Sequence, residues 1–473
     1  MKIPEIFATG QEVDTQTIRE HAQARFQELS MLVSSNPDWT VVSVALNIPG
    51  SIKTNQLIQN FFQNGVKRFE NSLIARGLTF KCQLQDDLSP TGPERGYLIK
   101  GNPLLIKSHT SHFEEANPSA NLFNLDVLAV LNGEIRTLPR EAVKAPARRC
   151  LICDKPAKFC QAQQRHSIEE LQTQVDRLIQ LQLEADRQGQ MAQQFGKLAT
   201  QALLEEVAIW PKPGLVDPLE HLSHPDMDHF TFIKSALSLQ DYFTKCALVG
   251  LTTHEDNYQL VFDEIRQFGL VAEREMNLAT AGVNTHKGAI FTLGIIATAA
   301  GIIINRDQWS FDQLKLTIQQ MLAKLMHDDL QSQKEPTEAT AGQQQYHQYG
   351  LGGVREEAAL GYPTVFNYGL PAYQAAADQS SNDRGVTTLL AIARHTMDSN
   401  LIKRAGNMDI LQERDHWIDE IDAAGGITTD LGRQKLNEMS VEFARRRLSM
   451  GGSADLLSAT LFIAMIDNLQ NKM

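Results

Sequence analysis

Polar and charged side chains precede a long apolar segment in the second half of the chain. Asn284, His286 and Lys287 lie in the sequence NTHK, and the following run to Ile304 has no charged residue. Asn284 or the neighbouring Thr285 can cap a helix by accepting its free backbone N–H groups. Lys287 then lies at the positive end of the helix dipole, where a phosphate group is favoured. The alternative is a buried core helix whose polar start is only a cap.

Four further segments of the second half place charged residues beside the expected ends of helices. They are WPKPGLVD with Lys212 and Asp217, GLGGVREE with Arg355, TMDSNLIKR with Asp398, Lys403 and Arg404, and GGSAD with Ser453 and Asp455. Each segment alone is explained by a cap or a loop. Five such segments in one helical region favour a shared pocket for an anion and a metal ion.

A predicted β-hairpin at 122–138 carries the polar residues of the first half. Its turn, Asn132-Gly133, lies between two alternating runs, which is typical of a hairpin. Asn124 and Asp126 are two residues apart on one strand, so their side chains share a face, and Glu114 can join them. Such oxygen ligands can hold Mg²⁺ against a polyphosphate. The alternative is an exposed polar face of a strand.

Three cysteines and a histidine follow within a short segment. Cys150, Cys153, Cys160 and His166 have the spacing Cys-x2-Cys-x6-Cys-x5-His, which supplies four ligands for a tetrahedral structural Zn²⁺ site. The spacing differs from that of a standard zinc finger, and burial of a plain cysteine cluster is the alternative.

Length and composition predict a soluble protein of two domains. The chain has 473 residues, of which 42% are hydrophobic and 21% charged. A net charge of −12 argues against nucleic acid or an anionic membrane as a partner. Five cysteines indicate no disulfide framework, and the first ten residues contain no apolar signal segment, so we expect a cytoplasmic location.

The first half is predicted to be α+β. We expect helices at 15–33 and 55–77, strands at 39–46, 80–84 and 97–100, and a turn near Pro49-Gly50 that presents Lys53 to a phosphate. Ser167 and Glu170 form a capping box for a helix to about residue 190. A glutamine-rich helical connector at 181–194 marks the expected domain boundary.

The second half is predicted to be all-α. We expect helices at 198–209, 228–248, 255–278, 286–304, 311–328, 351–361, 386–399, 431–446 and 453–470. The apolar run at 288–304 is slightly short for a membrane span and is rich in small residues that allow close helix packing. We therefore expect it to be the central helix of a soluble domain, with no membrane partner.

The second half, 195–473, resembles the triphosphoribosyl-dephospho-CoA synthase family of the citrate lyase system. The matching segments are LLEEVAIWPKPGLVD, ATAGVNTHKGAIF, QYGLGGVREEAALGY, DSNLIKRAG and GGSADLL, in the family's order. The first half, 1–182, resembles the phosphoribosyl-dephospho-CoA transferase that modifies the citrate lyase acyl carrier protein. Its matching segments are NIPGSIKTN, TGPERG, NPSANLFNLDVL and RRCLIC. The whole chain therefore resembles a bifunctional fusion of the two enzymes.

The resemblance implies two consecutive reactions. In the second half, the ribose 2′-hydroxyl of 3′-dephospho-CoA attacks C1′ of the ATP ribose and expels adenine. Lys212, Lys287 and Arg355 are assigned to phosphates, and Asp217, Asp398 and Asp455 to Mg²⁺ binding, activation of the hydroxyl or stabilisation of the ribosyl charge. The remaining predicted nucleotide-binding residues are Asn284, His286, Lys403, Arg404 and Ser453.

In the first half, the resemblance implies a nucleotidyltransferase-like domain. A serine of the apo acyl carrier protein (the citrate lyase γ subunit) attacks the α-phosphorus of the triphosphoribosyl product and releases pyrophosphate. Lys53 is expected to bind phosphate, with Glu114, Asn124 and the catalytic Asp126 at Mg²⁺. Asn121 replaces the family's arginine, and Asn124 replaces its first aspartate, which removes a charge that would offset the metal ion.

Three other functions are compatible with these residues. The same chemistry would serve the carrier protein of a malonate decarboxylase. A helical domain with acids at helix starts is also typical of Mg²⁺-dependent ADP-ribosyl hydrolases. The substitution at Asn124 is compatible with a carrier-binding module whose transferase domain is inactive.

Overall fold

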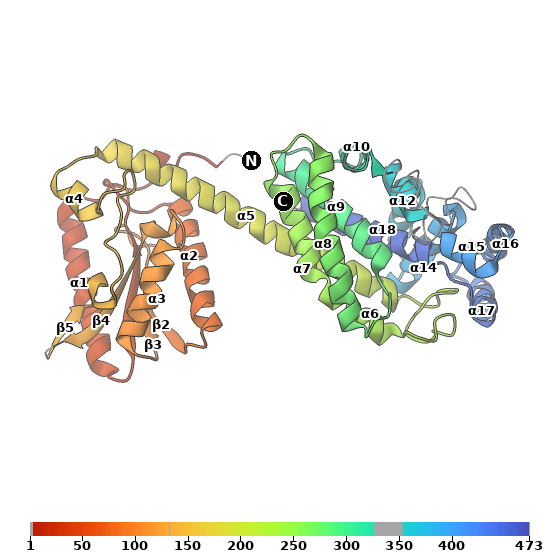
Figure 1. Cartoon of the computed structure of the whole chain (residues 1–473), viewed down its shortest axis with the longest axis horizontal. Helices are drawn as coiled ribbons and strands as arrows, with labels where there is room; N and C mark the ends of the chain where they lie inside the picture. The colour runs from red at the N-terminus through yellow and green to blue at the C-terminus, as the bar shows by residue number, and fades with distance from the viewer. Residues whose placement is uncertain (1–2, 132, 326–352, 473) are drawn as a thin grey trace, which may run out of the picture. The chain divides into compact units, whose positions relative to one another are not determined.

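The computed structural model describes residues 3–131, 133–325 and 353–472 (Figure 1). Contacts divide the chain into two compact units, Met1–Arg187 and Gln188–Met473. The first is an α/β unit built on a small antiparallel sheet, and the second is helical in its described residues, as the sequence predicts for each half. Each unit is therefore described separately.

The sheet of the first unit has the strand order β2-β3-β1-β4-β5. Its strands are β1 (Thr40–Leu46), β2 (Phe80–Asp86), β3 (Glu94–Ile99), β4 (Phe123–Leu131) and β5 (Glu134–Thr137). The central strand β1 pairs antiparallel with β3 and β4, and β4 pairs with β5. The predicted hairpin is confirmed by the β4–β5 pair, although Asn132 of its turn lies outside the described residues.

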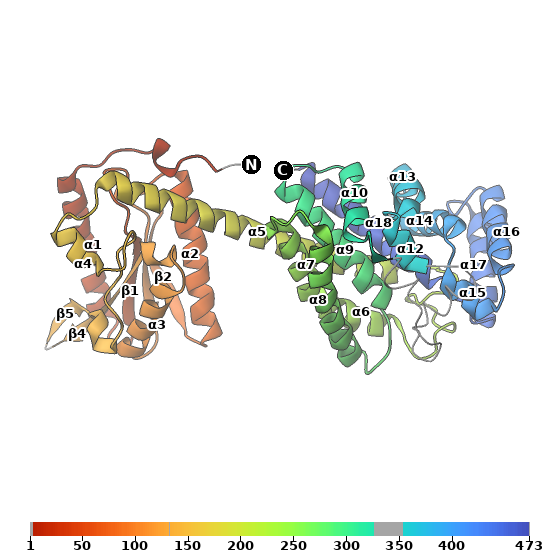
Figure 2. The same ribbon diagram turned by 45° about the horizontal axis from the view of Figure 1, so that its top comes forward.

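Helices cover both faces of this sheet (Figures 1 and 2). On one face Val41 packs with Leu29 and Val33 of α1 (Thr15–Ser35). On the other face Val42 and Val44 join a larger core with α2 (Gln56–Ala75), α3 (Pro103–Glu115) and the first part of α5 (Ile168–Ala208). Successive residues of β1 thus enter opposite cores, which explains why this strand is apolar throughout its centre.

Two helices of the first unit differ from expectation. The helix α3 was not predicted, because its sequence, PLLIKSHTSHFEE, mixes polar and apolar residues. Asn102 caps its start, and Pro103 is its first residue. The predicted capping box is confirmed, since Ser167 and Glu170 exchange hydrogen bonds at the start of α5. The helix α5 then continues through the glutamine-rich connector to Ala208, where a helix at 198–209 was predicted separately.

The second unit is organised around α9 (Lys287–Asn305), in which fifteen residues are buried. This helix is long and apolar enough to cross a membrane, but 83% of its apolar 18-residue window is buried within the protein. It packs against α7 (Gln240–Thr252) at glycines: a Cβ on Gly250 or Gly301 would overlap backbone atoms of the other helix. The expected role of small residues in close packing is therefore confirmed.

Several of the other described helices of this unit pack against α9. These other helices are α6 (His229–Ser238), α8 (Tyr258–Ala279), α10 (Phe311–Met321), α12 (Gly353–Ala359), a π-helix (Val365–Gly369), α13 (Leu370–Ala375), α14 (Ser381–His395), α15 (Ser399–Ala405), α16 (Ile410–Ala423), α17 (Asp430–Arg445) and α18 (Gly451–Gln470). The predicted helix at 228–248 is wrong as a single element, because Leu239 interrupts it between α6 and α7. The helices α13, α15 and α16 were not predicted. Residues 326–328 and 351–352 of two predicted helices lie outside the described residues.

Candidate active sites

The helices α9 and α18 begin beside each other in the second unit. Gly288, in the first turn of α9, lies against the side chain of Asp455, the fifth residue of α18, and a Cβ on Gly288 would overlap that carboxyl group. A cavity of about 270 Å³ opens at this point. Five residues predicted from the sequence line it: Asn284, His286, Lys287, Arg404 and Asp455.

Asp455 has an unusual environment for a carboxyl group. No described residue donates a hydrogen bond to it or forms an ion pair with it. A second acidic residue, Glu206, lines the same cavity. Burial, followed by repulsion from Glu206 and Asp398, raises the pKa of Asp455 to about 8. A cation or a proton donor bound in this cavity would therefore be attracted to Asp455.

His286 offers a neutral hydrogen-bond donor to the same cavity. The Thr285 hydroxyl donates to Ser235 Oγ at 2.7 Å, and the Ser235 hydroxyl in turn lies 2.7 Å from His286 Nδ1. Because Ser235 then donates to Nδ1, the ring proton lies on Nε2, which is buried and has no hydrogen-bond partner among the described residues. Burial, with repulsion from Lys212, lowers the pKa of His286 to about 3, so the ring is neutral at physiological pH.

Two cations line the same cavity as Asp455. Lys287 Nζ lies 2.8 Å from Glu273 Oε2 and is well exposed, so it can reach a ligand. The Arg404 guanidinium donates to the carbonyl oxygens of Ser223 and Arg447 at 2.6 and 3.0 Å, which fixes its position at the cavity. The Asn284 side chain accepts from Lys287 N at 3.3 Å, as expected for a residue that caps α9.

Lys212 and Asp217 support this cavity without lining it. The Lys212 ammonium is buried and pairs with Glu206 Oε1 at 2.5 Å. The Asp217 carboxylate accepts from the backbone N–H groups of Lys212, Leu219 and Glu220 at 2.8 to 3.0 Å, and thereby holds the proline-containing loop. Both side chains were predicted to contact substrate, and the structure places each one in an internal contact.

Asp398 and Ser453 connect α15 to α18. The buried Asp398 carboxylate caps α15 and also accepts from Ser453 N and Oγ at 2.9 and 3.0 Å. Burial raises the pKa of Asp398. The pair therefore sets the position of the start of α18, two residues before Asp455.

Arg355 and Lys403 are also absent from the lining of the cavity. Arg355 lies on α12, and Lys403 is exposed on α15. The residues that the sequence did not single out are Glu206 and His224, which also line the cavity. Glu206 belongs to the LLEEVAIWPKPGLVD segment, so its position in that motif was the available signal.

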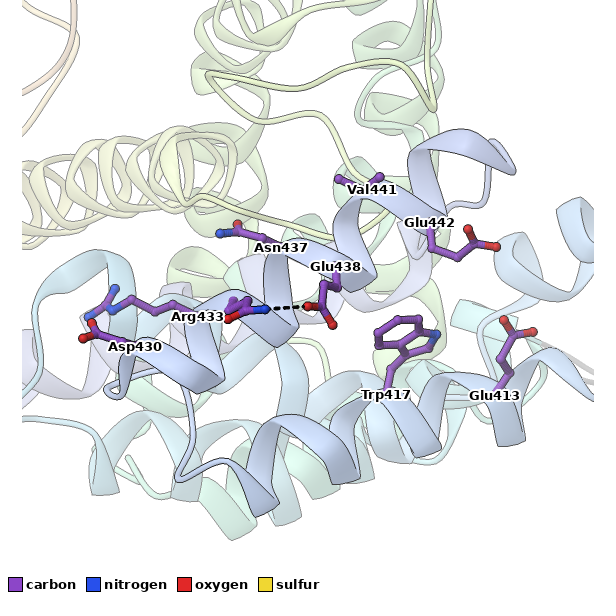
Figure 3. Close-up of a pocket in the computed structure, with 9 residues that line it drawn as sticks. Glu413, Trp417, Asp430, Arg433, Asn437, Glu438, Val441 and Glu442 are labelled. Carbon is purple, nitrogen blue, oxygen red and sulfur yellow. Dashed lines mark hydrogen bonds between the residues drawn. The ribbon is translucent and has the colours of Figure 1, made fainter.

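A different, acidic cavity of about 780 Å³ lies between α16 and α17 (Figure 3). Glu413 and Trp417 of α16 face α17, where Gln434 donates a hydrogen bond to Glu438 at 2.9 Å. None of the predicted site residues lines it.

In the first unit, a cavity of about 1170 Å³ contains the predicted Glu114, Asn124 and Asp126. Glu114 is buried, and it accepts from Leu125 N at 2.7 Å, Arg148 Nη2 at 2.7 Å and Arg140 Nη1 at 2.9 Å. Burial raises the pKa of Glu114, although the positive charge of Arg148 acts to lower it. Glu114 therefore positions two arginines, and both of its oxygens are already occupied.

Asn124 and Asp126 lie together on one face of β4, as predicted. Asn124 Nδ2 donates to Asp126 Oδ2 at 2.6 Å, and Arg148 Nη2 lies 3.3 Å from Asn124 Oδ1. Lys107 also lines the cavity and donates to the Leu125 carbonyl oxygen at 3.3 Å. A carboxylate and an amide oxygen fit an Mg²⁺ ion that takes its other ligands from water and substrate phosphates.

Lys53 does not line this cavity. Its ammonium donates to the Ile48 carbonyl oxygen at 2.6 Å, and burial lowers its pKa. The cations at the cavity are instead Lys107, Arg140, Arg148, Arg149 and Lys158, which the sequence did not single out. Two of them, Arg148 and Arg149, belong to the RRCLIC segment.

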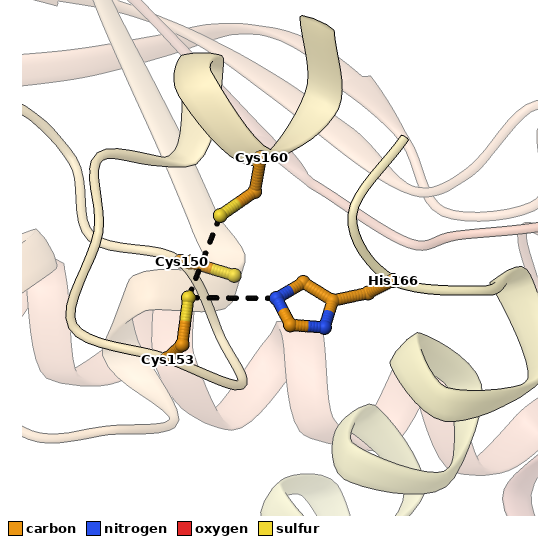
Figure 4. A group of neighbouring side chains, drawn as sticks. All are labelled: Cys150, Cys153, Cys160 and His166. Atoms are coloured by element: carbon orange, nitrogen blue, oxygen red, sulfur yellow. Dashed lines mark hydrogen bonds between the residues drawn. The ribbon is translucent and has the colours of Figure 1, made fainter. Parts of the chain in front are cut away.

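Cys150, Cys153, Cys160 and His166 form a cluster at the same cavity (Figure 4). One candidate ligand atom from each residue lies within 4.8 Å of the others. Cys153 Sγ is 3.4 Å from both Cys160 Sγ and His166 Nε2. The sequence therefore predicted the members of this cluster correctly as neighbours.

The chain matches two family models in its two halves. Residues 15–182 match the family of apo-citrate lyase phosphoribosyl-dephospho-CoA transferase, and residues 192–473 match the family of ATP:dephospho-CoA triphosphoribosyl transferase.

Several known proteins are similar to the chain. It is 34% identical to Protein CitXG of Leuconostoc mesenteroides subsp. cremoris, over 97% of this chain and 98% of that protein. It is 30% identical to Protein CitXG of Haemophilus influenzae, over 89% of this chain and 90% of that protein. A probable 2-(5''-triphosphoribosyl)-3'-dephosphocoenzyme-A synthase of Lactiplantibacillus plantarum is 42% identical over 56% of this chain and 95% of its own length. The chain therefore belongs to the CitXG family of fused transferases, in which a citrate lyase transferase region precedes a triphosphoribosyl-dephospho-CoA synthase region.

Proposed function

We propose that the chain makes the citrate lyase prosthetic group in its second unit and attaches it with its first. In the second unit, the 2′-oxygen of 3′-dephospho-CoA forms a bond to C1′ of the ATP ribose, and the bond from that carbon to adenine breaks. The hydroxyl proton passes to a carboxylate. Adenine leaves with the electron pair of the broken bond and takes up a proton, from that carboxyl group or from water, so that it is released as the neutral base. In the first unit, a serine oxygen of the apo acyl carrier protein attacks the α-phosphorus of the product, and pyrophosphate leaves.

The observation that carries the first step is Asp455 at the joint start of α9 and α18. A carboxyl group whose pKa is raised to about 8 is a stronger base, once ionised, than an ordinary aspartate. Binding of a cation or of Mg²⁺ with ATP would favour its ionised form. The carboxylate can then accept the hydroxyl proton or stabilise positive charge that develops on the ribose.

The remaining groups of this cavity suit the triphosphate and the ribose. Lys287 and Arg404 supply positive charge, and the start of α9 supplies free N–H groups. The neutral His286 Nε2–H can donate to a phosphate or ribose oxygen that would satisfy its unpaired buried atom. Lys212 and Asp398 contribute by holding Glu206 and α18 in place.

In the first unit, the proposed reaction is a nucleotidyl transfer. The cations Lys107, Arg140 and Arg148 line the same cavity as Asp126, which suits a substrate with three phosphates. Asp126 and Asn124 would hold Mg²⁺, which supplies charge neutralisation at the reacting phosphate. Arg148 provides charge beside Asn124, and this supports activity despite the asparagine at that position. Free cysteines in both units support a reducing cytoplasm as the location.

Mass spectrometry of the apo acyl carrier protein tests the whole proposal. After incubation with the chain, ATP, Mg²⁺ and 3′-dephospho-CoA, the carrier should gain the mass of phosphoribosyl-dephospho-CoA on a serine. Adenine should appear only when dephospho-CoA is present; its release from ATP alone would indicate a hydrolase. A preformed triphosphoribosyl substrate that leaves the carrier unmodified would rule out an active first unit.

The Asp455→Asn variant tests the assignment of the site. We expect turnover for adenine release to fall by about 10² or more, because the amide cannot accept the proton or stabilise the ribosyl charge. Asp312→Asn is the matched control, since that carboxylate is 90% exposed on α10 and should leave the rate unchanged. Equal rates in wild type and Asp455→Asn would contradict the assignment.

A further inference from the structure

We propose that Cys150, Cys153, Cys160 and His166 bind one Zn²⁺ ion and that this ion holds the segment with Arg148 and Arg149 against the cavity of the first unit. The metal site itself is independent of the proposed function, because it depends only on the cluster. Its consequence for Arg148 extends the proposed function by identifying how a phosphate-binding residue is positioned.

The arrangement of the four ligands fits a tetrahedral ion. At a Zn–S distance of about 2.3 Å, two sulfurs of a tetrahedral site lie about 3.8 Å apart. The three cysteines and the histidine have ligand atoms within 4.8 Å of one another, and the closest pairs are 3.4 Å apart. The side chains converge on one point in Figure 4. An ion can thus be bound with small adjustments of side-chain torsions.

The backbone around the cluster is also suited to metal binding. Arg149 and Pro156 form an antiparallel bridge, and Cys150 N donates to the Lys155 carbonyl oxygen at 2.8 Å. This narrow loop presents Cys150 and Cys153 from one side. Cys160 comes from the short helix α4 (Ala157–Ala162), and His166 follows that helix. Three separate backbone segments therefore supply ligands. A metal ion bound to all of them would hold them together.

The core of the first unit gives this region little other support. The largest core cluster of that unit includes Leu151 only as a partly buried neighbour, and Ile152 and Phe159 are exposed. A loop with so few buried apolar groups opens easily unless it is cross-linked. A bound Zn²⁺ ion would supply that cross-link, since structural zinc contributes directly to folding free energy.

The same loop determines where Arg148 lies. Ala157 N, at the start of α4, donates to the Arg148 carbonyl oxygen at 2.8 Å, and Cys150 is two residues further along the chain. The Arg148 guanidinium then reaches Glu114 Oε1 at 2.7 Å and the Phe123 carbonyl oxygen at 2.9 Å. Loss of the ion would free the segment on which this arginine is anchored.

Zinc content of the purified full chain is the direct test. We expect about one Zn²⁺ per chain, and a Co²⁺-substituted form with the visible absorption of tetrahedral thiolate coordination. Cys153→Ser should lose the metal, whereas Cys82→Ser should keep it, since Cys82 lies on β2 outside the cluster. His166→Cys should retain more zinc than His166→Ala, because it restores a fourth ligand.

Limited proteolysis tests the positioning of the arginines. In the full chain, removal of zinc by a chelator or by Cys153→Ser should increase tryptic cleavage after Arg148 and Arg149 by about tenfold, with the sites of the second unit unchanged. Equal cleavage with and without the ion would overturn the positioning role. A metal-free protein with a Cys153–Cys160 disulfide would overturn the site. Neither result depends on transferase activity, so both are distinct from failure of the proposed function.

Discussion

Asp455 shows how neighbouring side chains determine the chemistry of a single residue. Its carboxyl is surrounded by helix N-termini, which favour negative charge, and by Glu206 and Asp398, which oppose it. Burial, together with repulsion from these two carboxyl groups, outweighs the effect of the helix N-termini, so the pKa of Asp455 rises to about 8. A residue in this state is costly for folding at neutral pH, which is typical of residues retained for function.

The cost can be measured as a pH dependence of stability. The folded-state pKa of about 8 lies above the unfolded value near 4, so the stability associated with the protonated form is lost as pH rises through this interval. Asp455→Asn removes this loss. The melting temperature of the variant minus that of wild type should therefore be several degrees greater at pH 8 than at pH 5. For the exposed control Asp312→Asn, we expect the same difference in melting temperature at both pH values. The same result for Asp455→Asn would contradict the raised pKa.

At the scale of helices, the site depends on the close approach of α9 and α18. Gly288 allows this approach because it has no side chain at the point where the Asp455 carboxyl lies. Asp398 and Ser453 then fix the start of α18 relative to α15. The position of the carboxyl is thus determined by three helix starts that are distant in sequence.

Gly288→Ala tests this packing. The added methyl group would overlap the Asp455 carboxyl, so the side chain must move, and we expect adenine release to fall at least tenfold with a stability loss of about 1–3 kcal/mol. Gly269→Ala in α8 is the control, because its added methyl would make only ordinary contacts. Adenine-release kinetics and thermal melting of both variants provide the measurements. Full activity in Gly288→Ala would show that the contact is unimportant.

At the scale of the whole molecule, each unit has hydrophobic cores of its own. The core residues of the second unit run from Ala192 to Ile466, and those of the first from Ile6 to Ile179. The long helix α5 contributes to both, with Val175 and Ile179 in one and Phe195 and Leu203 in the other. The two sets of reactive residues also fall on separate units.

We therefore expect residues 188–473 to fold and release adenine without the first unit. Gln188 is included because its side chain donates to the Leu251 carbonyl oxygen at 2.9 Å. Adenine release within about threefold of the full chain, together with a cooperative melting transition, is the expected result. A shorter fragment that begins at residue 204 should be insoluble, since it lacks Phe195, Ala199 and Leu203 of the core. An inactive or unfolded 188–473 fragment would contradict the independence of the units.

The sequence by itself determined the features that depend only on residues close together in the chain. The hairpin β4–β5, the capping box at Ser167 and the apolar helix α9 all follow from turn chemistry, capping and periodicity over a few residues. The motifs also determined the family, and they singled out Asp455, His286 and Lys287, which line one cavity. These patterns are local or lie in long contiguous segments, so a single sequence contains them.

Only the tertiary structure decided which candidates reach a cavity and which support it. Asp217 and Asp398 have the same charge as Asp455, but backbone N–H groups occupy their carboxylates. Glu114 was expected at Mg²⁺, yet it pairs with Arg140 and Arg148, which follow it by 26 and 34 residues. Such pairings depend on how α3, β4 and the loop before α4 pack together. Residue types and spacing show which groups can react, whereas the long-range packing determines which partners each group meets.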